Sequence, residues 1–514
     1  MNANAPTDAR RLPFPLVLAL LALACLVAAF LGRILGPSDL LQNTDQSKTI
    51  ALTADVVANA RWALPRDALG HLTRKPPLVN WVAALPVSLG FWSEWAFKLP
   101  SLLAALAAIA ATAAAARFLL RRPGVRLNQK STASGPVALA LLGAMLYLAS
   151  PSTIKHLYFC RPDMLFTACL AWGWYAGVRT IHDPQTNHRR WALLMWVAAG
   201  LALLAKGPLA LLVPAYALLA PLLIERRPAL LARAGFLWGL PLMLAIFLLW
   251  LVPAWLSDRT FVEQTLIGEE LLGRFGAGAT PANAPPGPGT PPYIVDVITS
   301  TYEIPSWFVE RFLFWAPFAL LGLAASPPWR WRSSPLAPAA LWVLMVFITT
   351  MLIRNRGGSY LMPSYPAASV LALGILLHRR SFLSPRLLGA LALLVTLLIT
   401  GREVFLSRAA RTGAGDHAWA FARAARAIVL DDPVVFVQTG HTPVPMMMGR
   451  ARAGEPSPEQ VKRAPWIVRP LPERPDPDRP GPDLISEPLL RVTARGTARA
   501  EPQRLGLFRA TDPR

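Results

Sequence analysis

Long apolar runs alternate with short polar connections over the first 400 residues of the chain. Most of the runs are close to the roughly 20 residues that a helix needs to cross the hydrocarbon of a bilayer. The pattern predicts about eleven membrane-spanning helices, at residues 12–35, 99–120, 136–153, 164–181, 191–205, 207–224, 235–255, 311–325, 335–353, 361–377 and 382–400. The runs at 136–153, 191–205 and 311–325 are short, which leaves tilted, extended or re-entrant helices as alternatives there.

Two connections are long, at about residues 36–98 and 256–310. The first contains a polar, helix-like piece around 46–60 and an apolar segment at 78–92 that Pro86 interrupts, which predicts an interfacial or re-entrant helix. The second contains GAGATPANAPPGPGTPP, residues 276–292, whose composition predicts an extended segment. A lid and an insertion without function are both consistent with it.

Beyond residue 401 the hydrophobicity falls and the pattern changes. It predicts helices and strands in turn, with 473–483 as a loop: helices at about 414–428 and 443–449, and strands at 433–438, 466–469, 489–492 and 505–509. The fold expected is a mostly α, polytopic membrane protein, residues 1–400, followed by a small α/β domain outside the membrane, residues 401–514.

Composition and charge agree with a membrane protein and indicate its orientation. The 514 residues are 54% hydrophobic and 16% charged, which excludes an ordinary soluble enzyme of this size. Lys and Arg gather in alternate connections, and such loops stay in the cytoplasm. The N-terminus is therefore expected inside, the C-terminal region outside, and the first run uncleaved. These inner loops explain most of the net charge of +22, so no nucleic-acid partner is expected.

Four groups of ionisable residues fall at the predicted outer ends of helices. They are Asp45 with Lys48, Arg74 with Lys75, Arg161 with Asp163, and Lys206. Charges near a membrane boundary are costly and mark functional sites. The predicted topology brings all four groups to one depth, where a lipid head group would lie.

These residue types suit chemistry on a lipid-linked phosphate. Lys75, Arg161 or Arg274 is suited to hold the phosphate and to stabilise it as a leaving group. Asp45 or Asp163 is suited to accept the proton of an attacking hydroxyl. Pro76 and Pro77 would fix the chain just after Lys75.

Structural roles compete with each of these assignments. Lys75 and Lys206 could extend to the head groups as helix-end lysines commonly do. Asp45 could cap the polar helix that follows it. Asp163 could do no more than pair with Arg161.

The remaining candidates have similar alternatives. Tyr360 and Tyr365 are typical of an interfacial aromatic belt. His71 has no second ligand at metal-binding spacing, and the three cysteines are isolated, so the sequence indicates no metal site or disulfide framework.

Six motifs in order along the chain resemble the GT-C glycosyltransferases of the aminoarabinose transferase and protein O-mannosyltransferase superfamily. They are QNTDQ (42–46), RKPPLVNW (74–81), FKLPSLLAAL (97–106), RPDMLFTACL (161–170), LLAKGPLALLVP (203–214) and SYLMPSYPAASVLAL (359–373). A lone KPP would indicate nothing, whereas the whole series at familiar spacing is specific. The resemblance covers about residues 12–400.

The resemblance implies roles for individual residues. Asp45 matches the acidic residue regarded as the catalytic base, Lys75 the residue near the donor phosphate, and Asp163 the carboxylate of the second outer loop. Arg274 resembles a donor-phosphate arginine. One position departs from the family, because Gln46 stands where relatives usually carry an acidic residue, of a kind suited to holding a metal or tuning the base.

The expected function is therefore transfer of a sugar from a polyprenyl-phosphate donor to an acceptor at the outer face of a bacterial inner membrane. Lipid A or another envelope glycan is the expected acceptor, and a protein Ser or Thr is the mannosyltransferase-type alternative. Membrane lipids are the other expected partners; no cofactor is indicated, although a divalent metal stays open. A flippase of lipid-linked sugars and an inactive scaffold are the rival classes, of which the first predicts repeat symmetry and polar residues within the spans.

Overall fold

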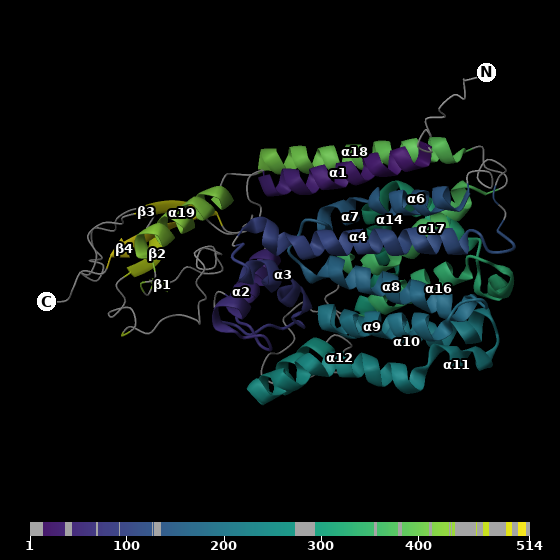
Figure 1. Cartoon of the computed structure of the whole chain (residues 1–514), viewed down its shortest axis with the longest axis horizontal. Helices are drawn as coiled ribbons and strands as arrows, with labels where there is room; N and C mark the ends of the chain where they lie inside the picture. The colour runs from purple at the N-terminus through teal and green to yellow at the C-terminus, as the bar shows by residue number, and fades with distance from the viewer. Residues whose placement is uncertain are drawn as a thin grey trace, which may run out of the picture.

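The computed structural model is a bundle of helices with a small sheet near the C-terminus (Figure 1). It describes residues 14–35, 44–67, 70–91, 93–125, 127, 135–272, 293–353, 357–378, 383–410, 414–430, 432, 434–436, 459, 466–471, 490–495 and 502–509. The main helices up to residue 410 are α1 (Phe14–Leu35), α2 (Thr44–Asn59), α3 (Leu78–Ser88), α4 (Glu94–Leu119), α6 (Gly135–Leu148), α7 (Pro151–His156), α8 (Pro162–His182), α9 (His188–Lys206), α10 (Leu212–Leu219), α12 (Phe236–Ser257), α14 (Tyr293–Phe312), α15 (Ala316–Ala324), α16 (Ala337–Met351), α17 (Tyr365–Leu376) and α18 (Pro385–Ala410).

Each of the eleven apolar runs coincides with helical structure. Within the described residues, six stretches are long and apolar enough to cross a membrane: Leu16–Arg33, Glu94–Leu119, Phe236–Ser257, Ile298–Ala324, Gly358–Leu376 and Pro385–Arg402. The others are shorter or less apolar, including α6, α8, α9 and α16. The chain is thus a multi-pass protein by length and composition, and the number eleven stays a prediction.

The helix expected at 311–325 begins much earlier than the hydropathy pattern suggested. It starts at Tyr293 and continues through α14, the short turn η7 (Leu313–Trp315) and α15. Polar residues such as Thr299 and Glu303 lower the mean hydropathy there without interrupting the helical backbone. The second long connection is therefore shorter than 256–310, and its first part is helical in α13 (Arg259–Phe261) and η5 (Val262–Leu272).

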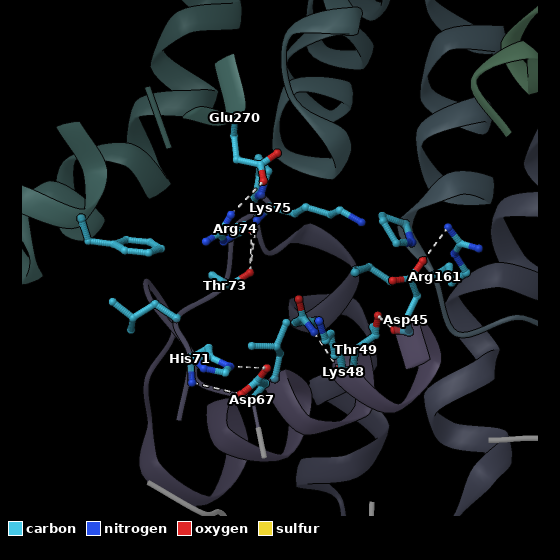
Figure 2. A pocket seen from close by; sticks show the side chains of 17 residues that line it. Asp45, Lys48, Thr49, Asp67, His71, Thr73, Arg74, Lys75, Arg161 and Glu270 are labelled. Carbon is cyan, nitrogen blue, oxygen red and sulfur yellow. Dashed lines mark hydrogen bonds and ion pairs between the residues drawn. The ribbon is translucent and has the colours of Figure 1, made fainter. Parts of the chain in front are cut away.

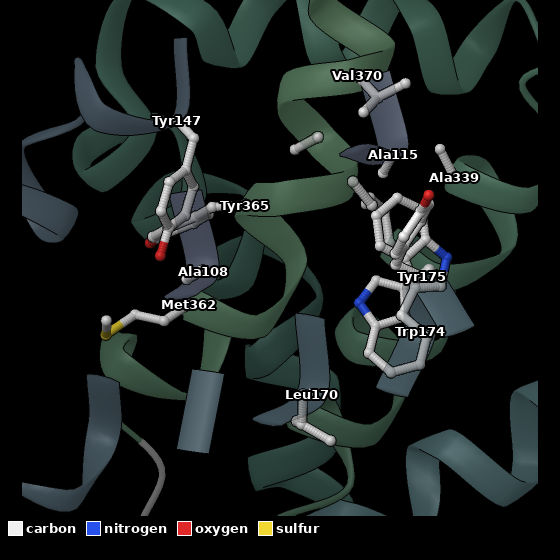
Figure 3. Close-up of a cluster of buried hydrophobic side chains, with 14 of the residues drawn as sticks. Ala108, Ala115, Tyr147, Leu170, Trp174, Tyr175, Ala339, Met362, Tyr365 and Val370 are labelled. Atoms are coloured by element: carbon white, nitrogen blue, oxygen red, sulfur yellow. The ribbon is translucent and has the colours of Figure 1, made fainter. Parts of the chain in front are cut away.

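The core of the bundle forms where α8 packs against α4, α9 and α10. Large aromatic side chains fill it, among them Trp174 and Tyr175 of α8 (Figure 3). Trp174 stacks on Trp342 of α16 with ring centroids 6.2 Å apart. Along one edge α1 lies beside α18, and along the opposite edge α12 packs on α9 (Figure 1). This arrangement fixes the ends of α8 and α9, which carry two of the candidate groups.

The first long connection folds as α2 and α3 at one end of the bundle (Figure 1). The buried amide of Asn80 in α3 donates to the Thr49 carbonyl and to the Thr53 hydroxyl of α2. The indole of Trp81 donates to the Trp62 carbonyl. The expected apolar segment at 78–92 is thus a helix that packs on α2; its place at the membrane interface stays a prediction.

The C-terminal region contains α19 (Ala414–Val429) and four strands: β1 (Val434–Phe436), β2 (Trp466–Leu471), β3 (Leu490–Arg495) and β4 (Pro502–Arg509). The strand order is β1-β2-β4-β3, with β1 and β2 parallel and the other pairs antiparallel. The strands coincide with the predicted ones, whereas the helix expected at 443–449 and the loop at 473–483 lie outside the described residues. A separate domain outside the membrane stays a prediction.

Candidate functional site

The start of α2 and the start of α8 meet through an ion pair. Asp45 lies in the first turn of α2, and Arg161 is the residue at the N-cap of α8. Arg161 Nη2 lies 2.9 Å from Asp45 Oδ2. The Asp45 side chain is 48% exposed, so the pair lies at the surface of a cavity rather than in the core.

Asp163 follows Arg161 by two residues, in the first turn of α8, and is only 2% exposed. The Lys206 ammonium, at the end of α9, donates to Asp163 Oδ1 at 2.6 Å. Arg161 Nε lies 3.0 Å from Asp163 Oδ2, but without hydrogen-bond geometry, so this contact is an ion pair only. Two cations therefore surround one buried carboxylate, and this arrangement stabilises its charged form.

Lys206 also lies against an aromatic ring. Its Nζ is 4.1 Å from the ring centroid of Tyr360, in the turn η9 (Gly358–Ser364). Tyr365 follows one turn later but has a different environment. It is fully buried, and its ring stacks on Phe312 at 5.2 Å. Tyr365 thus belongs to the core, and the aromatic-belt interpretation does not hold for it.

The segment before α3 carries the other candidate cations. Arg74 Nη1 donates to Glu269 Oε2 at 3.2 Å and lies 3.9 Å from Glu270 Oε1. Lys75 is exposed, and among the described residues no carboxylate is recorded against its ammonium. The Thr73 hydroxyl donates to the Lys75 carbonyl at 2.9 Å, which fixes the backbone there.

A cavity of about 560 Å³, here called the polar cavity, lies between these segments. In Figure 2, Arg74, Lys75 and Glu270 frame one side of it, Asp45 and Arg161 a second side, and Asp67 with His71 a third. Lys48, Thr49, Asn80 and Phe261 also line it. The polar cavity thus combines an accessible carboxylate with several cations.

A second cavity of about 380 Å³, here called the apolar cavity, adjoins the first. Its walls are mostly hydrophobic and include Met243, Phe247 and Trp250 of α12. Lys206 and Tyr360 lie on its lining as well. The two cavities share four lining residues, which are Arg74, Lys75, Pro76 and Glu270. Lys75 therefore stands at the junction between a polar and an apolar space.

The structure brings most of the sequence-predicted residues together. Asp45, Arg161, Arg74 and Lys75 line the polar cavity, and Lys206 lines the apolar one. Asp163 lines neither cavity but forms ion pairs with Arg161 and Lys206. Arg274 and the segment 276–292 lie outside the described residues.

Histidine 156, at the end of α7, belongs to the buried surroundings of Asp163. Burial lowers the pKa of His156 to about 4, and the nearby Asp163 charge opposes this shift. The ring Nδ1 lies 2.8 Å from the Ser152 carbonyl. The imidazole is therefore neutral at physiological pH.

No group of three or more His, Cys, Asp or Glu that could hold a metal ion occurs in the described part of the chain. Gln46 is buried, and its Oε1 accepts from the Cys160 backbone N–H at 3.0 Å. The amide is thus committed to a protein contact.

Sequence reasoning missed three features of the site. Glu269 and Glu270 pair with Arg74 although they are far apart in the sequence, and the available signal was two consecutive carboxylates within the second long connection. Asp67 lines the polar cavity beside His71. The walls of the apolar cavity had no sequence signal, because an apolar side chain in α12 reads the same whether it faces lipid or a cavity.

Comparisons with known proteins agree with this architecture. Residues 74–252, about a third of the chain, match the family model of dolichyl-phosphate-mannose-protein mannosyltransferase. The crystal structure of ArnT from Cupriavidus metallidurans bound to undecaprenyl phosphate superposes with a TM-score of 0.65 at 18% identity, covering 96% of this chain and 98% of that chain. ArnT in the apo state gives a TM-score of 0.63 at 17% identity, covering 97% and 99%. No match was found among curated proteins.

The family match and the fold indicate one class, the membrane glycosyltransferases: residues 74–252 are similar to a mannosyltransferase family, and the chain as a whole has an ArnT-like, multi-pass fold. Within that class its whole fold is similar to that of ArnT, over nearly the full length of both chains. The resemblance expected from the six motifs is thereby confirmed.

Proposed function

We propose that this protein transfers a sugar from a polyprenyl-phosphate donor to an acceptor hydroxyl or phosphate at the outer face of a bacterial inner membrane. The observation that carries the proposal is the position of Lys75 at the junction of the polar and apolar cavities. A polyprenyl-phosphate sugar has the same division, because an apolar chain meets a polar sugar at a charged phosphate.

The apolar cavity would take the first isoprene units of the donor. Its lining by α12 side chains supplies hydrophobic surface, and each methylene that it buries contributes about 0.8 kcal/mol. The phosphate would then lie at Lys75, whose ammonium has no recorded carboxylate partner among the described residues and can therefore neutralise an incoming anion. ArnT, whose fold this chain shares, was crystallised bound to undecaprenyl phosphate, which supports the donor class.

The other candidate cations near the phosphate position are each paired with a carboxylate. Arg74 is held by Glu269, and Lys206 by Asp163, so each would approach the phosphate with a counter-ion already beside it. Arg161 holds Asp45 and would reach the phosphate only by leaving that pair. Arg274 stays a donor-phosphate candidate on the family resemblance alone.

Asp45 is the residue we assign as general base. It lines the polar cavity with nearly half of its side chain exposed, where the acceptor would enter. The acceptor O–H would give its proton to the Asp45 carboxylate while the acceptor oxygen bonds to the anomeric carbon. The bond from that carbon to the phosphate oxygen breaks, and the polyprenyl phosphate leaves with the electron pair, stabilised by Lys75.

Asp163 has a different part in this scheme. Two cations contact it and the protein covers it, so it is poorly placed to accept a proton or to attack the sugar. We therefore assign Asp163 as a positioning residue for Arg161 and Lys206, in place of the catalytic role expected from sequence. Of the other carboxylates that line the polar cavity, Glu270 is paired with Arg74 and Asp67 with His71, so we assign no nucleophile among the described residues. The transfer would then be a single displacement, which inverts the anomeric configuration.

Two acceptor classes fit the polar cavity. The similarity to ArnT over the full chain favours lipid A or another envelope glycan, whereas the family match over 74–252 favours a protein Ser or Thr as in a mannosyltransferase. The predicted topology places the site and the C-terminal region on the periplasmic side in either case, with the N-terminus in the cytoplasm.

The test must distinguish sugar transfer from transport of the lipid-linked sugar across the membrane. The experiment supplies membrane vesicles with polyprenyl-phosphate sugars and measures sugar transfer by the wild type, by Asp45→Asn and by the control Asp183→Asn. Asp183 is a carboxylate paired with Arg179 at the other end of α8, away from both cavities. We expect the wild type and the control to consume a donor, and Asp45→Asn to lose about 10²-fold or more.

The product should carry the anomeric configuration opposite to that of the donor. If donors only change leaflet and no glycosidic bond breaks, the protein is a flippase. If Asp45→Asn transfers sugar like the wild type, Asp45 is not the base.

A further inference from the structure

We propose that Gln46 is a positioning residue that fixes the Asp45–Arg161 pair through the backbone of Cys160. This inference rests on the proposed function, since it concerns how the general base is held. It also gives a role to the residue at which the chain departs from its family.

The contact is a second tie between the same two segments. Asp45 and Gln46 are consecutive on α2, and their side chains reach Arg161 and Cys160, which are consecutive before α8. One tie is an ion pair of 2.9 Å, and the other is a hydrogen bond of 3.0 Å from the Cys160 N–H to Gln46 Oε1. Two adjacent ties fix both the position and the rotation of one segment relative to the other.

Burial makes the Gln46 tie specific. Gln46 is 1% exposed and Cys160 is fully buried, so removal of the amide would take an acceptor from the Cys160 N–H at a place that water does not reach. The ion pair alone is a weaker constraint, because the Arg161 and Asp45 side chains are 21% and 48% exposed. The buried amide therefore carries most of the positional constraint.

The neutral amide also suits its neighbours. Arg161 already contacts two carboxylates, Asp45 and Asp163. A third negative charge at position 46 would compete for the guanidinium and would disfavour the charged form of a base next to it. Gln46 supplies the acceptor oxygen that the backbone needs without that charge.

The first test probes the Gln46–Cys160 hydrogen bond without an activity assay. In a Cys25→Ala, Cys169→Ala background Cys160 is the single thiol, and its labelling by N-ethylmaleimide is measured on purified protein in nanodiscs. We expect Gln46→Ala to speed labelling at least about tenfold. Gln46→Glu keeps an acceptor oxygen and should leave Cys160 protected. The matched control is Asn80→Ala, which removes another buried amide contact to α2 but leaves Cys160 covered.

The second test measures how the Gln46 substitutions change kcat, KM and the pH–rate profile. Gln46→Ala should lower kcat about tenfold with little change in the KM for the donor, because the donor-binding cations are untouched. Gln46→Glu should keep more of kcat but move the acid limb of the pH–rate profile to higher pH. Faster labelling with unchanged turnover, or unchanged labelling, overturns the inference. If the wild type transfers no sugar, the proposed function is wrong. If Cys160 is labelled no faster in Gln46→Ala than in the control, the positioning role of Gln46 is wrong, whatever the activity of the wild type.

Discussion

At the scale of single residues, the two candidate carboxylates differ in environment rather than in chemistry. Asp45 is half-exposed in the polar cavity, and Asp163 is buried between Lys206 and Arg161. Both lie in the first turn of a helix, Asp45 in α2 and Asp163 in α8, so their positions in the sequence alone could not separate them. Their environments differ because Lys206, which is 43 residues further along the chain, donates a hydrogen bond to Asp163.

This difference predicts opposite effects of substitution. Asp163→Ala leaves the covered Lys206 ammonium without its carboxylate and removes one of the two carboxylates that contact Arg161, so we expect it to lower the free energy of unfolding by about 3 kcal/mol. Asp45→Asn should abolish transfer and leave stability within about 0.5 kcal/mol, because its ion pair is exposed. Thermal unfolding in detergent measures both. In the double variant Asp163→Leu, Lys206→Met much of the stability should return; if it does not, the loss does not come from unpaired charge.

At the scale of elements, the apolar runs predicted where helices lie, and polar interruptions obscured where some begin. Runs such as 235–255 coincide with helices to within a few residues, as in α12. The start of α14 was missed because polar residues such as Thr299 and Glu303 break the apolar run before residue 311, although the helix continues from Tyr293 to Phe312. The two cavities could not be predicted, because they depend on packing between α2, α3, η5 and α12, which are distant in sequence.

The buried His156, at the end of the short helix α7, predicts that the stability of the protein depends on pH. The pKa of His156 is lowered to about 4 in the folded protein, against about 6.5 when unfolded. Between these values the unfolded chain binds more protons, so stability is complete above pH 6.5 and is lost as the pH falls toward 4, by roughly 3 kcal/mol.

Thermal unfolding across this range is the measurement. The variant His156→Asn should have a much flatter profile between pH 6.5 and 4 than the wild type. Equal slopes in both proteins would assign the pH dependence to another group.

At the scale of the whole molecule, the predicted topology puts the site on the outer face of the membrane. The predicted orientation puts His71, on the rim of the polar cavity, outside, and Gln185, in the connection between α8 and α9, inside. In a background without the three native cysteines, His71→Cys should react with a membrane-impermeant maleimide in intact cells. Gln185→Cys should react only after permeabilisation. The reverse pattern would place the site on the cytoplasmic face and contradict the orientation.

The central claim is that Lys75, where the apolar cavity meets the polar one, receives the phosphate of the donor. The most direct test is equilibrium binding of polyprenyl phosphate to purified protein in nanodiscs, comparing the wild type, Lys75→Ala, Asp45→Asn and the control Lys155→Ala, an exposed lysine outside both cavities. We predict that Lys75→Ala raises the Kd about tenfold or more, as loss of a hydrogen bond to a charged group should. Asp45→Asn and the control should bind like the wild type. A Lys75→Ala variant with wild-type affinity would contradict the account.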